Sequence, residues 1–351
     1  MTIFRDIIIH VKHQPVNTKA EKIMIIPYLL AFFKYVIYGS SVFFTSSINE
    51  NADVLDILAL RFLMSLVVMW LLKTAKVIKM DLGVKEIFTK GRRSQFIPCL
   101  LLAALFEPVL YMFFETLGIS MTTNITTAVI LSLVPITCCI AEMIVLKENS
   151  TLLQKIFLAM GIIGVIYISV KTDTGDGKNS IWGILFLFLA IIVDPLFAVF
   201  SRKSTKAFSA MEITYASCML GAVIFNAVNI VRHLINGTIL DYFKPYFNLQ
   251  NMIGFVFLGV ISTILATGIN NYCLSKMQVS TMSAFSGVST LVTIIIGVFI
   301  GGEEMYYFHY IGLALIVTRM VGVAVIAMRR DANTVSIKPI EVPRSKDVAK
   351  K

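Results

Sequence analysis

Four ionisable residues lie inside long apolar runs of the chain, where a charged side chain would be out of place in the hydrocarbon of a membrane. They are Lys34, Glu107, Asp194 and Arg319. Placing such a group in the centre of a bilayer costs about 2.5–3.5 kcal/mol on insertion scales, so its presence there indicates function by default. Two are basic and two are acidic. They could pair as a structural lock or switch, or stand apart as sites for a proton or a substrate.

Each of the two acids directly precedes a proline, as Glu107-Pro108 and Asp194-Pro195. A proline inside a helix frees the carbonyl four residues earlier and bends the helix. A carboxylate beside a kink and a bare carbonyl predicts a proton or cation station. The alternative is a simple kink, next to an acid that reaches toward the interface.

A stripe of hydroxyl groups follows the ninth apolar run at the spacing i, i+3, i+7 and i+10: Ser283, Ser286, Thr290 and Thr293. That spacing keeps them on one helical face. Such a face either lines a water-filled path or lets neighbouring helices approach closely. Further hydrogen-bonding candidates for a substrate are Tyr38, Tyr111, Asn270 and Asn271. A lone tyrosine can equally be a packing residue or an interfacial anchor.

Two charged residues near the ends of runs have simpler interpretations. Arg61 follows Asp56 by five residues, so the sequence predicts that the two pair or that Arg61 binds a lipid phosphate. Glu115 is near a run end and is expected to snorkel toward water.

The composition predicts that the candidate residues lie on transmembrane helices. The chain has 351 residues, of which 57% are hydrophobic and 15% charged, with a mean hydropathy of +0.81. A soluble protein carries about 25% charged residues. The excess of apolar residues must face lipid, which predicts an all-α, multi-pass membrane protein. We expect ten transmembrane helices, near residues 23–45, 57–77, 96–117, 124–146, 153–170, 181–201, 211–231, 252–275, 280–300 and 307–328.

The basic residues predict the orientation of these ten spans. Of the 31 Lys and Arg, 24 fall on the side that carries both termini and 4 on the other, and Lys34, Arg61 and Arg319 lie within spans. The positive-inside rule therefore predicts that both termini are cytoplasmic. We expect residues 1–22 to form a polar cytoplasmic tail and residues 329–351 a disordered one.

Two stretches of the chain follow the same plan. Residues 122–148 begin with hydroxyl and amide groups, continue as an apolar run that contains Pro135, and end at Glu148. Residues 277–303 align with them at an offset of 155, with Thr290 in place of the proline and Glu303 at the end. This repeat predicts two five-helix halves, residues 23–171 and 180–328. Because five is odd, the second half must be inverted relative to the first, which places a substrate site near the midplane between them.

With these residues in view, the chain resembles the drug/metabolite transporter superfamily, in its ten-span form with two EamA-type repeats. The likeness rests on Tyr38-Gly39-Ser40, Arg61-Phe62, the spacing from Pro135 to Glu148, Gly301-Gly302-Glu303 and Gly312. It covers about residues 24–328. Three departures from the general pattern are Lys34, Thr290 and Arg319. The resemblance implies export or exchange of small metabolites, amino acids or amphiphilic drugs without ATP.

The sequence argues against several other functions. It has no Walker lysine loop and no nucleophile elbow, and its five cysteines and four histidines have no metal-ligand spacing, so no cofactor or metal is expected. The basic residues are dispersed, which argues against nucleic acid as a partner. The expected partners are a small-molecule substrate, the lipid bilayer and coupling protons, in a monomer or homodimer of a cell inner membrane. An intramembrane transferase and a non-transporting scaffold are the alternatives.

Overall fold

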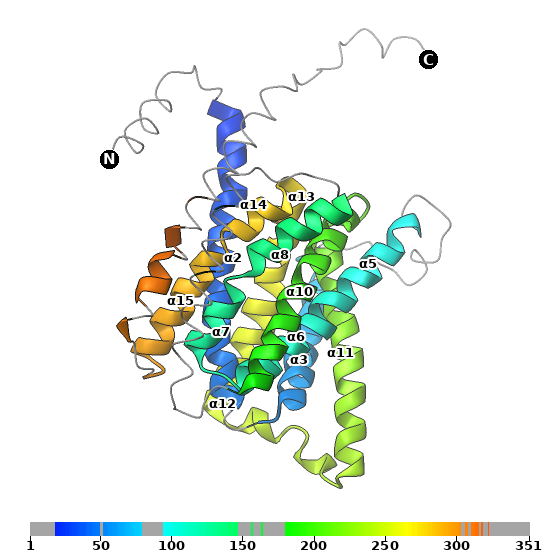
Figure 1. The fold of residues 1–351 in the computed structure, drawn as a ribbon. Coiled ribbons are helices and arrows are strands. Elements are labelled where there is room, and N and C mark those ends of the chain that lie inside the picture. The colour runs from blue at the N-terminus through cyan, green and yellow to red at the C-terminus, as the bar shows by residue number, and fades with distance from the viewer. Residues whose placement is uncertain are drawn as a thin grey trace, which may run out of the picture.

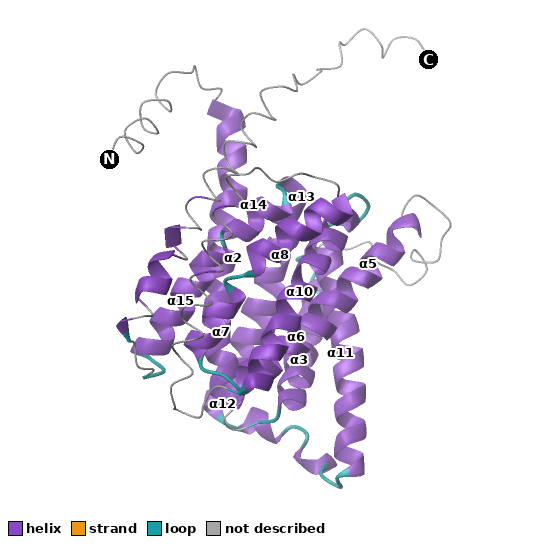
Figure 2. Ribbon diagram, viewed as in Figure 1, coloured by secondary structure: helices purple, strands orange, loops and turns teal. Residues whose placement is uncertain are grey.

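The computed structural model describes residues 18–49, 52–78, 94–146 and 180–302, together with single positions at 156 and 163 and several between 306 and 322. Every regular element in these ranges is helical, and Figure 2 accordingly shows purple helices joined by teal loops. The elements are α2 Thr18–Asn49, α3 Val54–Thr74, η1 Ser94–Phe96, α5 Ile97–Ala104, η2 Leu105–Tyr111, α6 Met112–Ser120, α7 Asn124–Leu131, α8 Val134–Ala141, η3 Glu142–Leu146, α10 Ile181–Ser204, α11 Ala210–Ile235, η4 Ile239–Asp241, η5 Lys244–Phe247, α12 Leu249–Val256, η6 Phe257–Ala266, α13 Thr267–Lys276, α14 Val279–Ala284 and α15 Ser286–Phe299.

Within the described ranges, eight helical stretches are long and apolar enough to cross a bilayer. They are Ile26–Ile48, Val54–Thr74, Ser94–Ser120, Asn124–Val145, Ile181–Ser204, Ala210–Ile235, Leu249–Lys276 and Thr281–Phe299. They coincide with the first four predicted spans and with the sixth to the ninth. The fifth predicted span lies almost wholly outside the described residues, and the tenth is described only in part. The prediction of an all-helical, multi-pass membrane protein is confirmed, whereas the number ten and the orientation remain predictions.

The distribution of polarity across the bundle is that of a membrane protein. Large apolar side chains face outward, such as Phe33, which is 57% exposed, Trp70 at 56% and Ile192 at 56%. Polar and charged side chains are buried, among them Lys34, which is 5% exposed, and Glu107, also at 5%. In water the outer surface would be an extended apolar patch, so its stable surroundings are lipid.

Several of these spans are not single uniform α-helices. The third span contains the π-helical segment η2, and the eighth contains the π-helical segment η6 between α12 and α13. The fourth is interrupted between α7 and α8, and the ninth between α14 and α15. A π-helical turn hydrogen-bonds across five residues, and such turns are frequent at functional sites. The helices α7 and α14 begin at Asn124 and Val279, which are 155 residues apart, the offset of the sequence repeat.

The two Glu/Asp-Pro pairs are accommodated in different ways. Pro108 lies within η2. Proline cannot donate the α-helical hydrogen bond at its position, and the wider π-helical turn accommodates this missing bond. Pro195 lies within α10, which remains α-helical from Ile181 to Ser204. The proline therefore changes the helix type in the third span, and the sixth span stays regular.

Close helix contacts position the interior of the bundle, in which α2 runs down the centre and α11 lies at one edge (Figure 1). Helices α2 and α15 approach at Gly39, where a Cβ would lie 2.5 Å from the carbonyl oxygen of Ser289. Thr293 Oγ1 donates to the Gly39 carbonyl at 2.8 Å. Helices α3 and α11 pack through stacked rings of Phe62 and Phe225, whose centroids are 5.6 Å apart. These contacts leave a polar space between α2, η2 and α10.

Candidate functional site

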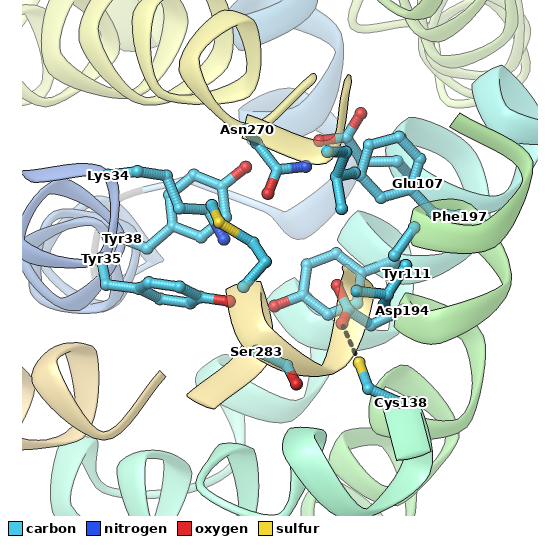
Figure 3. Close-up of a pocket in the computed structure, with 14 residues that line it drawn as sticks. Lys34, Tyr35, Tyr38, Glu107, Tyr111, Cys138, Asp194, Phe197, Asn270 and Ser283 are labelled. Atoms are coloured by element: carbon cyan, nitrogen blue, oxygen red, sulfur yellow. Dashed lines mark hydrogen bonds between the residues drawn. The ribbon is translucent and has the colours of Figure 1, made fainter. Parts of the chain in front are cut away.

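A polar cavity with two lobes lies in the interior of the bundle (Figure 3 shows the first lobe). The lobes hold about 390 Å³ and 490 Å³ of space between atoms, open solvent included. They share five residues, which form a waist between them: Lys34, Tyr35, Tyr38, Tyr111 and Asp194. The first lobe adds Glu107, Asn270 and Ser283, among others, and the second adds Glu115, Ser286, Thr290 and Thr293.

The position of the cavity along the spans is central. Lys34, Glu107 and Asp194 each lie near the middle of their spans, Ile26–Ile48, Ser94–Ser120 and Ile181–Ser204. The structure therefore brings together, in one space, three of the four charged residues that the sequence singled out. Arg319, the fourth, lies outside the described residues.

Lys34 is held by aromatic rings. Its Nζ lies 3.7 Å from the ring centroid of Tyr35 and 4.0 Å from that of Tyr38. No carboxylate oxygen of the residues that the structure describes lies within 4.0 Å of this nitrogen. A desolvated cation–π contact contributes about 2 kcal/mol or more, which offsets part of the cost of burying the charge. The ammonium therefore stays available to a ligand in the cavity.

Glu107 is the end of a hydrogen-bonded chain across three spans. Thr267 Oγ1 donates to Glu107 Oε1 at 3.1 Å, and the Tyr38 hydroxyl lies 3.2 Å from the same Thr267 oxygen. When Glu107 is ionised, the Thr267 proton points to the carboxylate, and the Tyr38 hydroxyl then donates to Thr267. The chain links the waist of the cavity to Glu107 through a residue directly after the π-helical segment η6.

The other two acids of the cavity differ in their contacts. Asp194 is half-buried, and Cys138 Sγ donates a long, weak hydrogen bond to its Oδ2 at 3.9 Å (Figure 3). Glu115 accepts a hydrogen bond of 2.7 Å from the Tyr111 hydroxyl and lines the second lobe. The expectation that Glu115 snorkels toward water is therefore wrong, because the helix rotation turns this acid into the bundle.

The neighbouring amides Asn270 and Asn271 have different environments. Asn271 is fully buried and accepts from Ser201 Oγ at 2.7 Å while donating to Thr214 Oγ1 at 3.0 Å, so it ties α13 to α10 and α11. Asn270 is 6% exposed, and its amide makes no side-chain hydrogen bond within the described part of the chain. It extends between Tyr38 and Glu107 into the first lobe (Figure 3). A ligand in the first lobe can therefore hydrogen-bond to this amide without breaking a contact within the described residues.

The hydroxyl stripe of the ninth span serves both purposes that its spacing allowed. Ser283 lines the first lobe, and Ser286, Thr290 and Thr293 line the second. Thr293 also holds α15 against α2, as described above, and Thr290 Oγ1 makes long contacts to the carbonyls of Ser286 and Ala128, at 3.4 and 3.5 Å. The buried Ser286 Oγ has no partner among the described residues, so it is a free hydrogen-bonding group of the second lobe.

Sequence reasoning did not single out Tyr35 and Thr267. Lys34 and Tyr38 are four residues apart on a helix and therefore share a face, which was a usable signal for the aromatic contact. Thr267 had no signal, because a single threonine in an apolar run is common and its partners come from other spans.

Arg61 is a second buried cation, and its predicted pairing with Asp56 is wrong. It is 2% exposed, and its Nε and Nη2 donate to Thr263 Oγ1 at 2.8 Å and Ser262 Oγ at 3.2 Å. Five residues advance a helix by about 500°, which leaves the two side chains on different faces. Asp56 instead accepts hydrogen bonds from Asn229 at 3.0 Å and Arg232 at 2.7 Å.

Within the described residues, no group of three or more His, Cys, Asp or Glu side chains has the arrangement of a metal site. The groups in the cavity are instead one ammonium, several carboxylates, phenols, hydroxyls and an amide. This set can bind a small polar or zwitterionic molecule and can exchange protons through its carboxylates.

Comparison with known proteins identifies the family. The model of the EamA-like transporter family matches residues 25–170 and again residues 181–328. A relative from Bacillus subtilis (strain 168), described as the uncharacterized transporter YcxC, is 30% identical over 295 residues, which cover 84% of this chain and 91% of the relative. A crystal structure of a protein with no functional description matches 86% of this chain and 98% of its own with a TM-score of 0.60 at 15% identity, which shows a shared fold. The chain is a multi-pass membrane protein that belongs to the EamA-like transporter family.

Proposed function

We propose that this protein is a secondary active transporter that exports or exchanges a small metabolite, such as an amino acid or an amphiphilic compound, by alternating access about the central cavity. Family membership makes it a transporter and sets aside the transferase and scaffold alternatives. The substrate, the energy source and the direction of transport are the parts that we propose.

The observation that carries the proposal is the ammonium at the waist, which has no ion-pair partner among the described residues. Lys34 has no carboxylate oxygen within 4.0 Å among the described residues, although Glu107 and Asp194 line the same lobe. A molecule with both an anionic and a cationic group can contact the ammonium at one end and a carboxylate at the other. Charge-assisted hydrogen bonds of this kind contribute about 1.5–3 kcal/mol each.

The two lobes support alternating access. The first lobe is lined by Leu274, near the Lys276 end of α13, and the second by Val42, on the Asn49 side of α2. The two lobes therefore lie on opposite sides of the shared waist. We infer that the two five-helix halves, residues 23–171 and 180–328, rock about this waist. In this arrangement the ten spans form inverted repeats with both termini in the cytoplasm, and the chain lies in the cell inner membrane.

Protons are the proposed coupling ion. Glu107 is linked to Tyr38 through Thr267, so a change of its protonation alters a hydrogen-bonded chain that spans three helices. Substrate that binds between Lys34 and the carboxylates competes with the proton for the same acids. This competition supplies the coupling of a proton exchanger.

Counterflow in proteoliposomes tests the proposal. Purified protein is reconstituted, loaded with one of a panel of unlabelled amino acids and related metabolites, and supplied with the labelled compound outside. We expect labelled uptake by the wild type and its loss in Glu107→Gln. If the variant retains counterflow, Glu107 does not bind the substrate, and if it also retains uptake driven by a pH gradient, Glu107 has no part in transport. If no compound gives counterflow and none shifts the thermal stability, the proposed substrate class is wrong.

A further inference from the structure

The segment that connects α11 to α12 is fixed to one end of the bundle by its tyrosines. The hydroxyl of Tyr242 donates to Asn226 Oδ1 at 2.6 Å, and that of Tyr246 donates to the Leu60 carbonyl at 2.6 Å. Gln250 Nε2 donates to Ser47 Oγ at 2.8 Å, near the Asn49 end of α2. Burial raises the pKa of both phenols, so they remain neutral donors.

The opposite side of the same segment is strongly apolar. Leu240 is 97% exposed, Phe247 87%, Leu249 77% and Phe243 50%. Tyr242, between the outward residues, is 5% exposed. The segment thus directs its phenols inward and its aliphatic and aromatic side chains outward. A loop that remained in water would gain nothing from such a surface, and a contiguous exposed apolar patch marks an interaction site.

This apolar surface continues onto the outward faces of the adjoining spans. Ile235, at the end of α11, is 79% exposed, and Ile253, on α12, is 55% exposed. An apolar groove with about 790 Å³ of space, open solvent included, lies between α2 and α12 directly beside the segment. Its walls are mainly aromatic and aliphatic, including Phe43, Phe44 and Ile48. The outward faces of these spans contact lipid, so the surface of the segment is continuous with the lipid-facing belt.

We propose that residues 239–249 lie in the interface of the bilayer, with Leu240, Phe243, Phe247 and Leu249 inserted among lipid chains at the headgroup boundary. Lys244 and Asp241 lie 3.7 Å apart and are 76% and 57% exposed at their side chains, which places charges at the level of the headgroups. The segment has the features of an interfacial element: an apolar face, a charged edge and short helical turns that use their backbone groups locally. The partner of this surface is therefore the lipid bilayer.

Tryptophan fluorescence tests the location. The chain has two tryptophans, Trp70 and Trp182, which are replaced by phenylalanine to give a silent background. Phe247→Trp then places one indole on the proposed face. The control variant in the same background is Lys206→Trp, at an exposed position in the turn between α10 and α11. Both proteins are reconstituted in phosphatidylcholine vesicles, with and without bromine on the acyl chains.

We expect brominated lipid to remove most of the fluorescence of the Phe247→Trp variant, and iodide in the buffer to quench it little. The Lys206→Trp variant should show the reverse. Strong quenching of Phe247→Trp by iodide would place the segment in water and overturn the proposal. Quenching by neither agent would place it under protein, such as a second copy of the chain, and would also overturn it. If Phe247→Trp does not fold, Leu240→Trp takes its place with the same expected outcomes.

Discussion

Replacing Lys34 by methionine should separate a binding role from a structural one. Lys34 Nζ contacts the rings of Tyr35 and Tyr38 at 3.7 and 4.0 Å and has no carboxylate oxygen within 4.0 Å among the described residues. The variant loses a cation–π stabilisation of about 2 kcal/mol. It also escapes a burial cost of about 2.5–3.5 kcal/mol. We therefore expect the free energy of unfolding to stay the same or to rise by about 1 kcal/mol.

The effect of this substitution on binding should be much larger. If the ammonium contacts the anionic group of the substrate, its loss removes a charge-assisted hydrogen bond of about 1.5–3 kcal/mol, which corresponds to about tenfold to hundredfold weaker binding. The assay is counterflow as a function of substrate concentration, with thermal unfolding measured on the same preparation. A suitable control is Lys203→Met, because Lys203 lies near the end of α10, 5.6 Å from the Phe200 ring and outside both lobes. A large loss of thermal stability in Lys34→Met with unchanged substrate affinity would refute the reasoning.

Three further outcomes follow from the same contacts. Thr267→Val breaks the hydrogen-bonded chain from Tyr38 to Glu107, so uptake driven by a pH gradient should fall about tenfold. Counterflow needs no net proton movement and should persist. An equal loss in both assays would contradict a role of this chain in proton coupling. Gly39→Val should lower the free energy of unfolding by about 1–3 kcal/mol, because a Cβ there would meet the Ser289 carbonyl at 2.5 Å, and an unchanged melting temperature would contradict this close contact. Asp56→Asn should lower the free energy of unfolding by about 1.5–3 kcal/mol, because it removes the charge that accepts hydrogen bonds from Asn229 and Arg232, although Asp53 still pairs with Arg232. Asp53→Asn, at a side chain 75% exposed, should cost less than about 1 kcal/mol, and comparable melting curves for the two variants would contradict this ranking.

The sequence by itself determined the class of the protein and the outline of its spans. Hydropathy works in a membrane because each apolar run must satisfy its own backbone hydrogen bonds and contact lipid, so the signal is contained in the run itself. Eight predicted spans coincide with helices of the structure for this reason. The cost of burying charge likewise made Lys34, Glu107 and Asp194 recognisable without coordinates.

The tertiary structure alone decided which polar groups meet. Asn270 and Asn271 are adjacent in sequence, yet one enters the cavity and the other ties three helices together, because successive helical residues point about 100° apart. Arg61 binds hydroxyls of η6, some 200 residues away, instead of the nearby Asp56. Such choices depend on how spans rotate and pack against one another. Packing in lipid is set by close contacts such as that at Gly39, which no local pattern of hydropathy encodes.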